Sequence, residues 1–93
     1  MIYVTDGYFI VPTQYGYNVA KPTKGKDGKP GWDYQAYYTS LVGAITGLRG
    51  IVQRERLSSE GEIDLNEAIN IAQQVDEEFK LLLEDVKERI GDG

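Results

Sequence analysis

The sequence predicts an α+β fold: a three- or four-stranded antiparallel β-meander, followed by two α-helices packed on one face of the sheet. Short runs rich in β-branched and aromatic residues occupy residues 1–38, with turn residues between them. At Thr39-Ser40 the apolar spacing changes from alternation to steps of three and four, which indicates helices. A length of 93 residues suits one domain, with a meander over 1–38 and helices over 40–57 and 64–90.

The first hairpin is predicted by Asp6-Gly7, which separates strand-like residues 2–5 from residues 8–11. An Asp-Gly pair between two such runs favours a two-residue turn, because glycine adopts positive φ without a clash. Pro12 lacks an N–H group, so the second strand is expected to end there or to lie at an edge.

A second hairpin is predicted around a lysine-rich loop. A third strand is expected over 17–20, a loop over 21–31 with Asp27-Gly28 at its tip, and a fourth strand over 32–38. Strict alternation in the fourth strand would place four side chains on one face, toward the helices. These side chains are Trp32, Tyr34, Ala36 and Tyr38.

Two helices follow, each with a candidate cap. Ser40 can accept a hydrogen bond from the first turn of one helix, and Asp64 with Glu67 resembles a capping box for the other. The second helix carries a heptad stripe that fits either packing within the chain or a dimer seam. The stripe consists of Leu65, Ala68, Ala72, Val75, Phe79, Leu82 and Val86.

Composition excludes several kinds of chemistry. The chain has no cysteine and no histidine, so disulfides, thiolate nucleophiles and imidazole bases cannot occur. We therefore expect no enzyme activity, no cofactor and no metal site. No apolar run approaches the ~20 residues of a membrane span, and residues 1–20 do not resemble a secretion signal, so a cytoplasmic protein without membrane contact is expected.

Charge is distributed unevenly along the chain. Residues 1–57 have a net charge of +3 and residues 58–93 a net charge of −8. A set of lysines and tyrosines could bind a partner or nucleic acid, or could be a solvated hairpin tip and ordinary packing. This set consists of Lys24, Lys26, Lys29, Tyr15, Tyr17 and Tyr37.

The second helix also carries a row of carboxylates. The row could imitate a phosphate backbone and occupy a basic groove of a partner protein, or it could be a solvated face. Intrahelical pairs of Asp76 with Lys80 and of Asp85 with Arg89 would favour the solvated face. The candidate partner-binding carboxylates are Asp76, Glu77, Glu84, Asp85 and Glu88.

Residues 21–86 resemble a family of small phage and prophage proteins of unassigned function. The resemblance is carried by a Lys/Gly-rich hairpin, a Tyr-Tyr-x-Ser-Leu junction and an acidic closing helix. The matching junction and helix residues are Tyr37, Tyr38, Ser40, Leu41, Arg54, Leu57 and Ser59. The resemblance implies a β-meander followed by helices and a phage setting, and it supplies no catalytic residues. Glycines 43, 47 and 50 depart from the Leu/Ala/Glu-rich pattern of that family.

Three functions are consistent with these observations. The first is a non-enzymatic phage-type protein that blocks or modulates a host or phage protein, most concretely an anti-CRISPR-like inhibitor of a nuclease or another nucleic-acid-handling enzyme. The second is an accessory protein that binds single-stranded DNA or RNA through the lysine loop and the aromatic residues. The third is an assembly protein that acts through a helical seam, so both a monomer and a homodimer are open.

Overall fold

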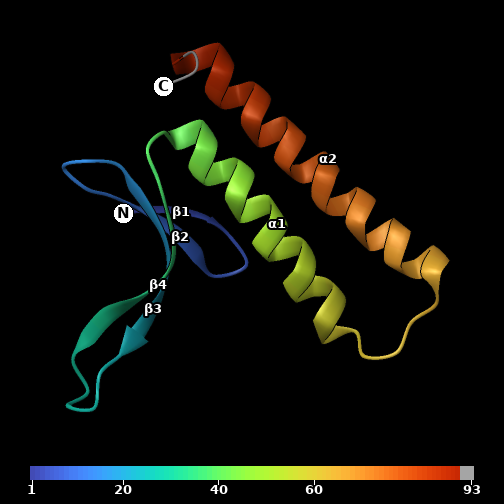
Figure 1. The fold of residues 1–93 in the computed structure, drawn as a ribbon, viewed down its shortest axis with the longest axis horizontal. Helices are drawn as coiled ribbons and strands as arrows, with labels where there is room; N and C mark the ends of the chain where they lie inside the picture. The colour runs from blue at the N-terminus through green and yellow to red at the C-terminus, as the bar shows by residue number, and fades with distance from the viewer. Residues whose placement is uncertain (91–93) are drawn as a thin grey trace. The chain divides into compact units, whose positions relative to one another are not determined.

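The computed structural model of the chain describes residues 1–90 and confirms the predicted α+β class (Figure 1). Four antiparallel strands form one open sheet in the order β1–β2–β3–β4, and two helices follow. The strands are β1 (Ile2–Thr5), β2 (Tyr8–Pro12), β3 (Tyr17–Lys24) and β4 (Pro30–Tyr38), and the helices are α1 (Leu41–Ser59) and α2 (Leu65–Ile90).

Contacts divide the chain into two compact units. The first, which we call the sheet unit, is Met1–Ala44, and the second, the helical unit, begins at Ile45. The single domain and the covering of one sheet face by the helices therefore stay predictions.

The first hairpin forms as predicted. Thr5 pairs with Tyr8, which leaves Asp6 and Gly7 as a two-residue turn. Both turn residues have positive φ, 54° for Asp6 and 80° for Gly7, as the mirror-image turns of hairpins require. Pro12 ends β2, where its missing N–H group costs no ladder hydrogen bond.

The second hairpin is longer than predicted. The expected loop over 21–31 is wrong at both ends, because β3 continues to Lys24 and β4 begins at Pro30, directly opposite it. Beyond Ala20 no β2 residue pairs with β3, so Pro22 lies where β3 has an open edge and its missing N–H group is tolerated. The tip is held by a hydrogen bond from the Gly25 N–H to the Lys29 carbonyl, 2.9 Å, and by Gly28 with φ of 78°.

A β-bulge divides β4 and overturns the predicted alternation. Val19 pairs with Ala36 and the next residue, Ala20, pairs with Tyr34, which leaves Gln35 as an extra residue. Paired residues share a sheet face, and neighbours on β3 point to opposite faces. Tyr34 therefore lies on the face opposite to Ala36, and the expected common face for residues 32, 34, 36 and 38 is wrong.

The buried residues of the sheet unit lie mainly on the face of Ala36. Tyr8, Ile10 and Val19 belong to this face, and each is at most 3% exposed. Ala20 is also fully buried, although it lies on the opposite face beside Tyr34. The sheet unit therefore has one face of buried side chains, which are aliphatic apart from Tyr8, and a second face of different character.

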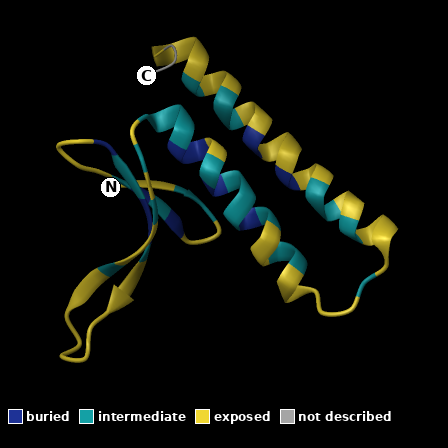
Figure 2. Cartoon of the chain, in the orientation of Figure 1, coloured by how far each residue is buried: buried dark blue, intermediate teal, exposed yellow. Residues whose placement is uncertain are grey.

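The helical unit contains two antiparallel helices that lie side by side (Figure 1). Leu48 and Val52 of α1 and Val75 and Phe79 of α2 have no exposed surface. The Gln53 side chain donates a hydrogen bond to the Ala72 carbonyl, 3.2 Å, and so links the helices. Most of α2 is exposed (Figure 2), and its buried residues are Val75 and Phe79.

Both predicted helix caps are confirmed. The Ser40 hydroxyl accepts a hydrogen bond from the Gly43 N–H, 3.0 Å, and an Asp64 carboxylate oxygen accepts one from the Glu67 N–H, 2.8 Å. Each cap satisfies an N–H group that has no partner inside its helix. The predicted start of α2 after Asp64 agrees with the structure.

Replacement of Asp64 by alanine is expected to lower the free energy of unfolding by about 1 kcal/mol, because the first turn of α2 loses its cap. Thermal unfolding followed by circular dichroism would measure the change, with Asp64→Asn as the matched control that keeps a capping oxygen. An equal loss in both variants would contradict a capping role.

Candidate functional site

Five aromatic side chains share the second face of the sheet, which we call the aromatic face. Tyr3 and Phe9 are direct partners, and their ring centroids are 5.3 Å apart. The Phe9 and Trp32 rings are 5.4 Å apart in an edge-to-face arrangement, although β3 separates their strands. Tyr34 and Tyr37 complete the set, since the bulge brings both to this face.

Small residues of β3 make the arrangement possible. Ala20 lies directly between Phe9 and Tyr34, and Pro22 lies opposite Trp32. Because neither β3 side chain is large, rings from β2 and β4 can meet across the intervening strand. The full burial of Ala20 agrees with a position beneath these rings.

The aromatic face is only partly used for packing. Edge-to-face contacts among Tyr3, Phe9 and Trp32 stabilise the sheet and account for these three rings. Tyr34 and Tyr37 are 57% and 50% exposed, and within residues 1–90 neither ring pairs with another aromatic ring. Contacts between aromatic rings therefore do not account for Tyr34 and Tyr37.

Gly16 holds Tyr37 in place. A Cβ atom at Gly16 would overlap the Tyr38 carbonyl oxygen and lie 2.6 Å from the Tyr37 hydroxyl oxygen. Thr13 fixes this backbone, because its hydroxyl oxygen accepts a hydrogen bond from the Gly16 N–H, 3.1 Å. The Tyr37 ring therefore lies close against the backbone of the β2–β3 turn.

Three lysines adjoin one end of the aromatic face. Lys24 lies on the same face as Trp32, because it is two residues from Pro22, the partner of Trp32. Lys26 and Lys29 belong to the hairpin tip beyond it. All three are exposed, and within the sheet unit their ammonium groups form no hydrogen bond or ion pair. Nearby Asp27 accepts a hydrogen bond from the Lys29 N–H, 3.0 Å.

The other predicted sheet residues are dispersed. Tyr15 lies in the turn between β2 and β3 and is 78% exposed. Tyr17 pairs with Tyr38 on the face of the buried aliphatic residues and is half-buried. Lys21 also lies on that face, where its ammonium nitrogen is 4.5 Å from the centroid of the Tyr8 ring. Of the three tyrosines predicted for the site, only Tyr37 lies on the aromatic face.

Arginines of the helical unit neutralise part of the acidic row on α2. Asp76 pairs with Arg49 of α1 at 2.8 Å, so its predicted pairing with Lys80 is wrong. The predicted pair of Asp85 with Arg89 is confirmed at 2.8 Å. Glu78 pairs with Arg56 at 3.0 Å, an ion pair between helices that sequence spacing does not indicate.

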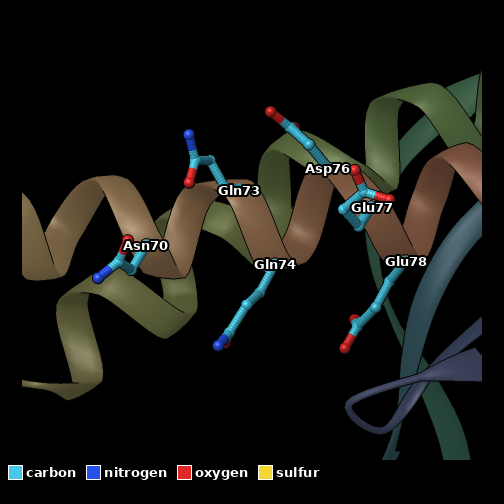
Figure 3. Close-up of a pocket in the computed structure, with 6 residues that line it drawn as sticks. All are labelled: Asn70, Gln73, Gln74, Asp76, Glu77 and Glu78. Atoms are coloured by element: carbon cyan, nitrogen blue, oxygen red, sulfur yellow. The ribbon is translucent and has the colours of Figure 1, made fainter.

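Three carboxylates of the row remain without a partner among the described residues. They are Glu77, Glu84 and Glu88, which lie seven and four positions apart and hence on one side of α2. Toward the start of the helix the surface is shallow and open, and its side chains diverge (Figure 3). The side chains drawn there are Asn70, Gln73, Gln74, Asp76, Glu77 and Glu78. Diverging polar groups do not form an enclosed ligand site.

The ion pair of Arg49 with Asp76 is expected to contribute less than about 1 kcal/mol, because the two side chains are 43% and 50% exposed. A double-mutant cycle with Arg49→Gln and Asp76→Asn, measured by urea unfolding, would give the coupling energy. The coupling should shrink in roughly 1 M salt, where charges are screened within about 3 Å. A coupling well above this value that is insensitive to salt would contradict a solvent-screened pair.

Comparison of the chain with protein-family profiles, with curated proteins and with solved structures yields no match. The resemblance to small phage proteins therefore stays a prediction. Over the part of the chain that the structure describes, no helix is long and apolar enough to cross a membrane. Within residues 1–90, no three or more His, Cys, Asp or Glu side chains are grouped so that they could hold a metal ion.

Proposed function

We propose that this chain is a non-enzymatic protein that binds single-stranded nucleic acid on the aromatic face. The observation that carries the proposal is the exposure of Tyr34 and Tyr37 on the same sheet face as three further aromatic rings, with unpaired lysines at one end. Exposed rings can stack on bases of any sequence, and each stacked base contributes about 1–3 kcal/mol. Lysines beside such rings neutralise the phosphates that accompany the bases.

A single strand fits this surface better than a duplex does. Stacking needs the flat face of a base, which the neighbouring base pairs cover in a duplex. The sheet unit has a net charge of +1, whereas the sequence from Ile45 onward has a net charge of −6. Attraction of phosphate is therefore confined to the sheet unit, and within it to the hairpin that carries the three unpaired lysines.

Binding of a fluorescently labelled single strand, followed by anisotropy, tests the proposal. If three phosphates are neutralised, a plot of log affinity against log salt concentration should have a slope of about −2. The affinity should then fall by roughly 20-fold between about 50 and 200 mM salt. The triple variant Lys24→Ala, Lys26→Ala, Lys29→Ala should bind more weakly and lose most of this slope. Equal binding of a duplex, or an unchanged slope in the variant, would contradict the proposal.

A second candidate is an inhibitor of a nucleic-acid-handling protein, in a phage or prophage setting. The observation that favours it is the unpaired row of Glu77, Glu84 and Glu88, because a row of fixed charges can complement a basic groove. If this candidate is right, a purified nuclease complex that the protein inhibits should escape inhibition when the three glutamates are changed to lysine. Inhibition that persists in that variant would exclude the carboxylate row as the contact surface.

A further inference from the structure

We infer that the ligand of the aromatic face is single-stranded DNA, held along β4 over about four nucleotides. This inference rests on the proposed function and specifies its ligand. Three features carry it. They are the position of the bulge at Gln35, the placement of the lysines at one end of β4, and the apolar character of the aromatic face between the lysines and the bulge.

The bulge determines how many bases can stack. Without Gln35 as an extra residue, Tyr37 would lie on the opposite face from Tyr34. With the bulge, Trp32, Tyr34 and Tyr37 follow one another along the same face of one strand. Two half-exposed tyrosines, with the partly exposed Trp32 beside them, provide platforms for two or three neighbouring bases.

The lysines extend the site at one end. Lys24 is opposite Pro30, two residues before Trp32, and Lys26 and Lys29 lie beyond it in the tip. Phosphates of the nucleotides next to the stacked bases would therefore meet ammonium groups on the Trp32 side. Two or three stacked bases and the flanking phosphates give about four nucleotides, the lower limit of the range for single-strand-binding modules.

The same geometry sets a length limit. The unpaired lysines of the sheet unit are confined to the hairpin at one end of β4, while the helical sequence is strongly acidic. A longer strand gains no further phosphate contacts on the sheet unit, and the net negative charge of the whole chain disfavours the additional phosphates. Affinity should therefore increase up to four or five nucleotides and then remain nearly constant.

The choice of DNA over RNA follows from desolvation. Apart from the tyrosine hydroxyls, the stretch from Trp32 to Tyr34 presents ring carbon, Ala20 and Pro22, and a ribose 2′-hydroxyl that lies against these groups loses water. A hydroxyl that is buried without a hydrogen-bond partner is unfavourable, and part of this cost remains at an open face. The methyl group of thymine adds apolar contact in place of the hydrogen of uracil.

A competition experiment tests the inference. Unlabelled oligothymidylates of two to ten nucleotides, or oligouridylates of the same lengths, compete with a labelled strand for the protein. We expect the affinity to level off near four nucleotides, and uridylates to bind about fivefold more weakly than thymidylates. Equal or tighter binding of uridylates, or a steady increase in affinity to ten nucleotides, would overturn the inference and leave the proposed function intact. Absence of binding to either polymer would instead overturn the proposed function.

Single variants locate the strand on β4. Tyr34→Ala should weaken thymidylate binding by about 10-fold or more, whereas Tyr34→Phe, which keeps the ring, should bind nearly as the parent does. Tyr15→Ala is the matched control, since Tyr15 is also exposed, at 78% against 57% for Tyr34, but lies in the turn between β2 and β3 and off the aromatic face. Circular dichroism confirms that each variant is folded. Equal losses in Tyr34→Ala and Tyr15→Ala, or no loss in Tyr34→Ala, would place the strand away from β4.

Discussion

Replacement of Phe79 by alanine is expected to lower the free energy of unfolding by about 3–5 kcal/mol. Phe79 is the largest fully buried side chain, and it lies on the buried side of α2 together with Val75. Its removal takes apolar surface out of the core and leaves a cavity that neighbouring side chains fill only in part. In a chain of 93 residues this is a large share of the total stability.

Urea unfolding monitored by circular dichroism would measure this loss. Leu81 provides the matched control, because it lies two residues further along the same helix and is 65% exposed. Leu81→Ala should change the stability by no more than about 0.5 kcal/mol. Similar losses in the two variants would show that the assigned inward and outward sides of α2 are wrong.

Replacement of Gly16 by alanine is expected to destabilise the sheet unit by about 1–3 kcal/mol and to displace Tyr37. The added methyl group would overlap the Tyr38 carbonyl and approach the Tyr37 hydroxyl oxygen to 2.6 Å. Since the carbonyl belongs to the backbone of β4, the turn or the strand must move. The variant should therefore lose both stability and affinity for single-stranded DNA.

Gly31 offers a matched control for this prediction. It also lies in the sheet, and a Cβ atom there would have no neighbour within 4 Å. Gly31→Ala should leave the unfolding midpoint and DNA affinity nearly unchanged. If Gly16→Ala matched Gly31→Ala in both properties, Tyr37 would not depend on close contact with the turn.

Local chemistry made much of the fold predictable. Asp6-Gly7 indicates a two-residue turn because few residue pairs tolerate two positive φ angles, and the structure has both. Ser40 and Asp64 indicate helix starts because their side-chain oxygens reach N–H groups three residues away. These signals depend on neighbours in the sequence, so no knowledge of the folded chain is required.

The bulge at Gln35 could not be predicted in the same way. An extra residue in one strand changes the face of every side chain beyond it, yet Gln35 has no special backbone requirement that the sequence reveals. Strict alternation therefore placed Tyr34 on the wrong face of the sheet, together with Tyr38. Phe9 was missed because its contact with Trp32 crosses a strand and depends on the small side chain of Ala20.

Long-range ion pairs were also beyond prediction from spacing. Asp76 is placed correctly for an intrahelical pair with Lys80, but Arg49 of the neighbouring helix reaches it at 2.8 Å. The pairing of Glu78 with Arg56 depends in the same way on how α1 and α2 pack. Of the predicted carboxylate row, only Glu77, Glu84 and Glu88 remain unpaired among the described residues, which leaves a smaller charged surface than composition indicates.

The most direct test of the aromatic face is the emission of Trp32, the single tryptophan of the chain, during titration with an eight-residue oligothymidylate. Trp32 contacts Phe9 on that face and precedes Tyr34 by two residues. We predict saturable quenching of the tryptophan emission in the parent protein and in Tyr15→Ala, and much weaker quenching at the same concentrations in Tyr34→Ala. Emission that stays unchanged while anisotropy reports bound DNA would show that the strand lies elsewhere on the molecule.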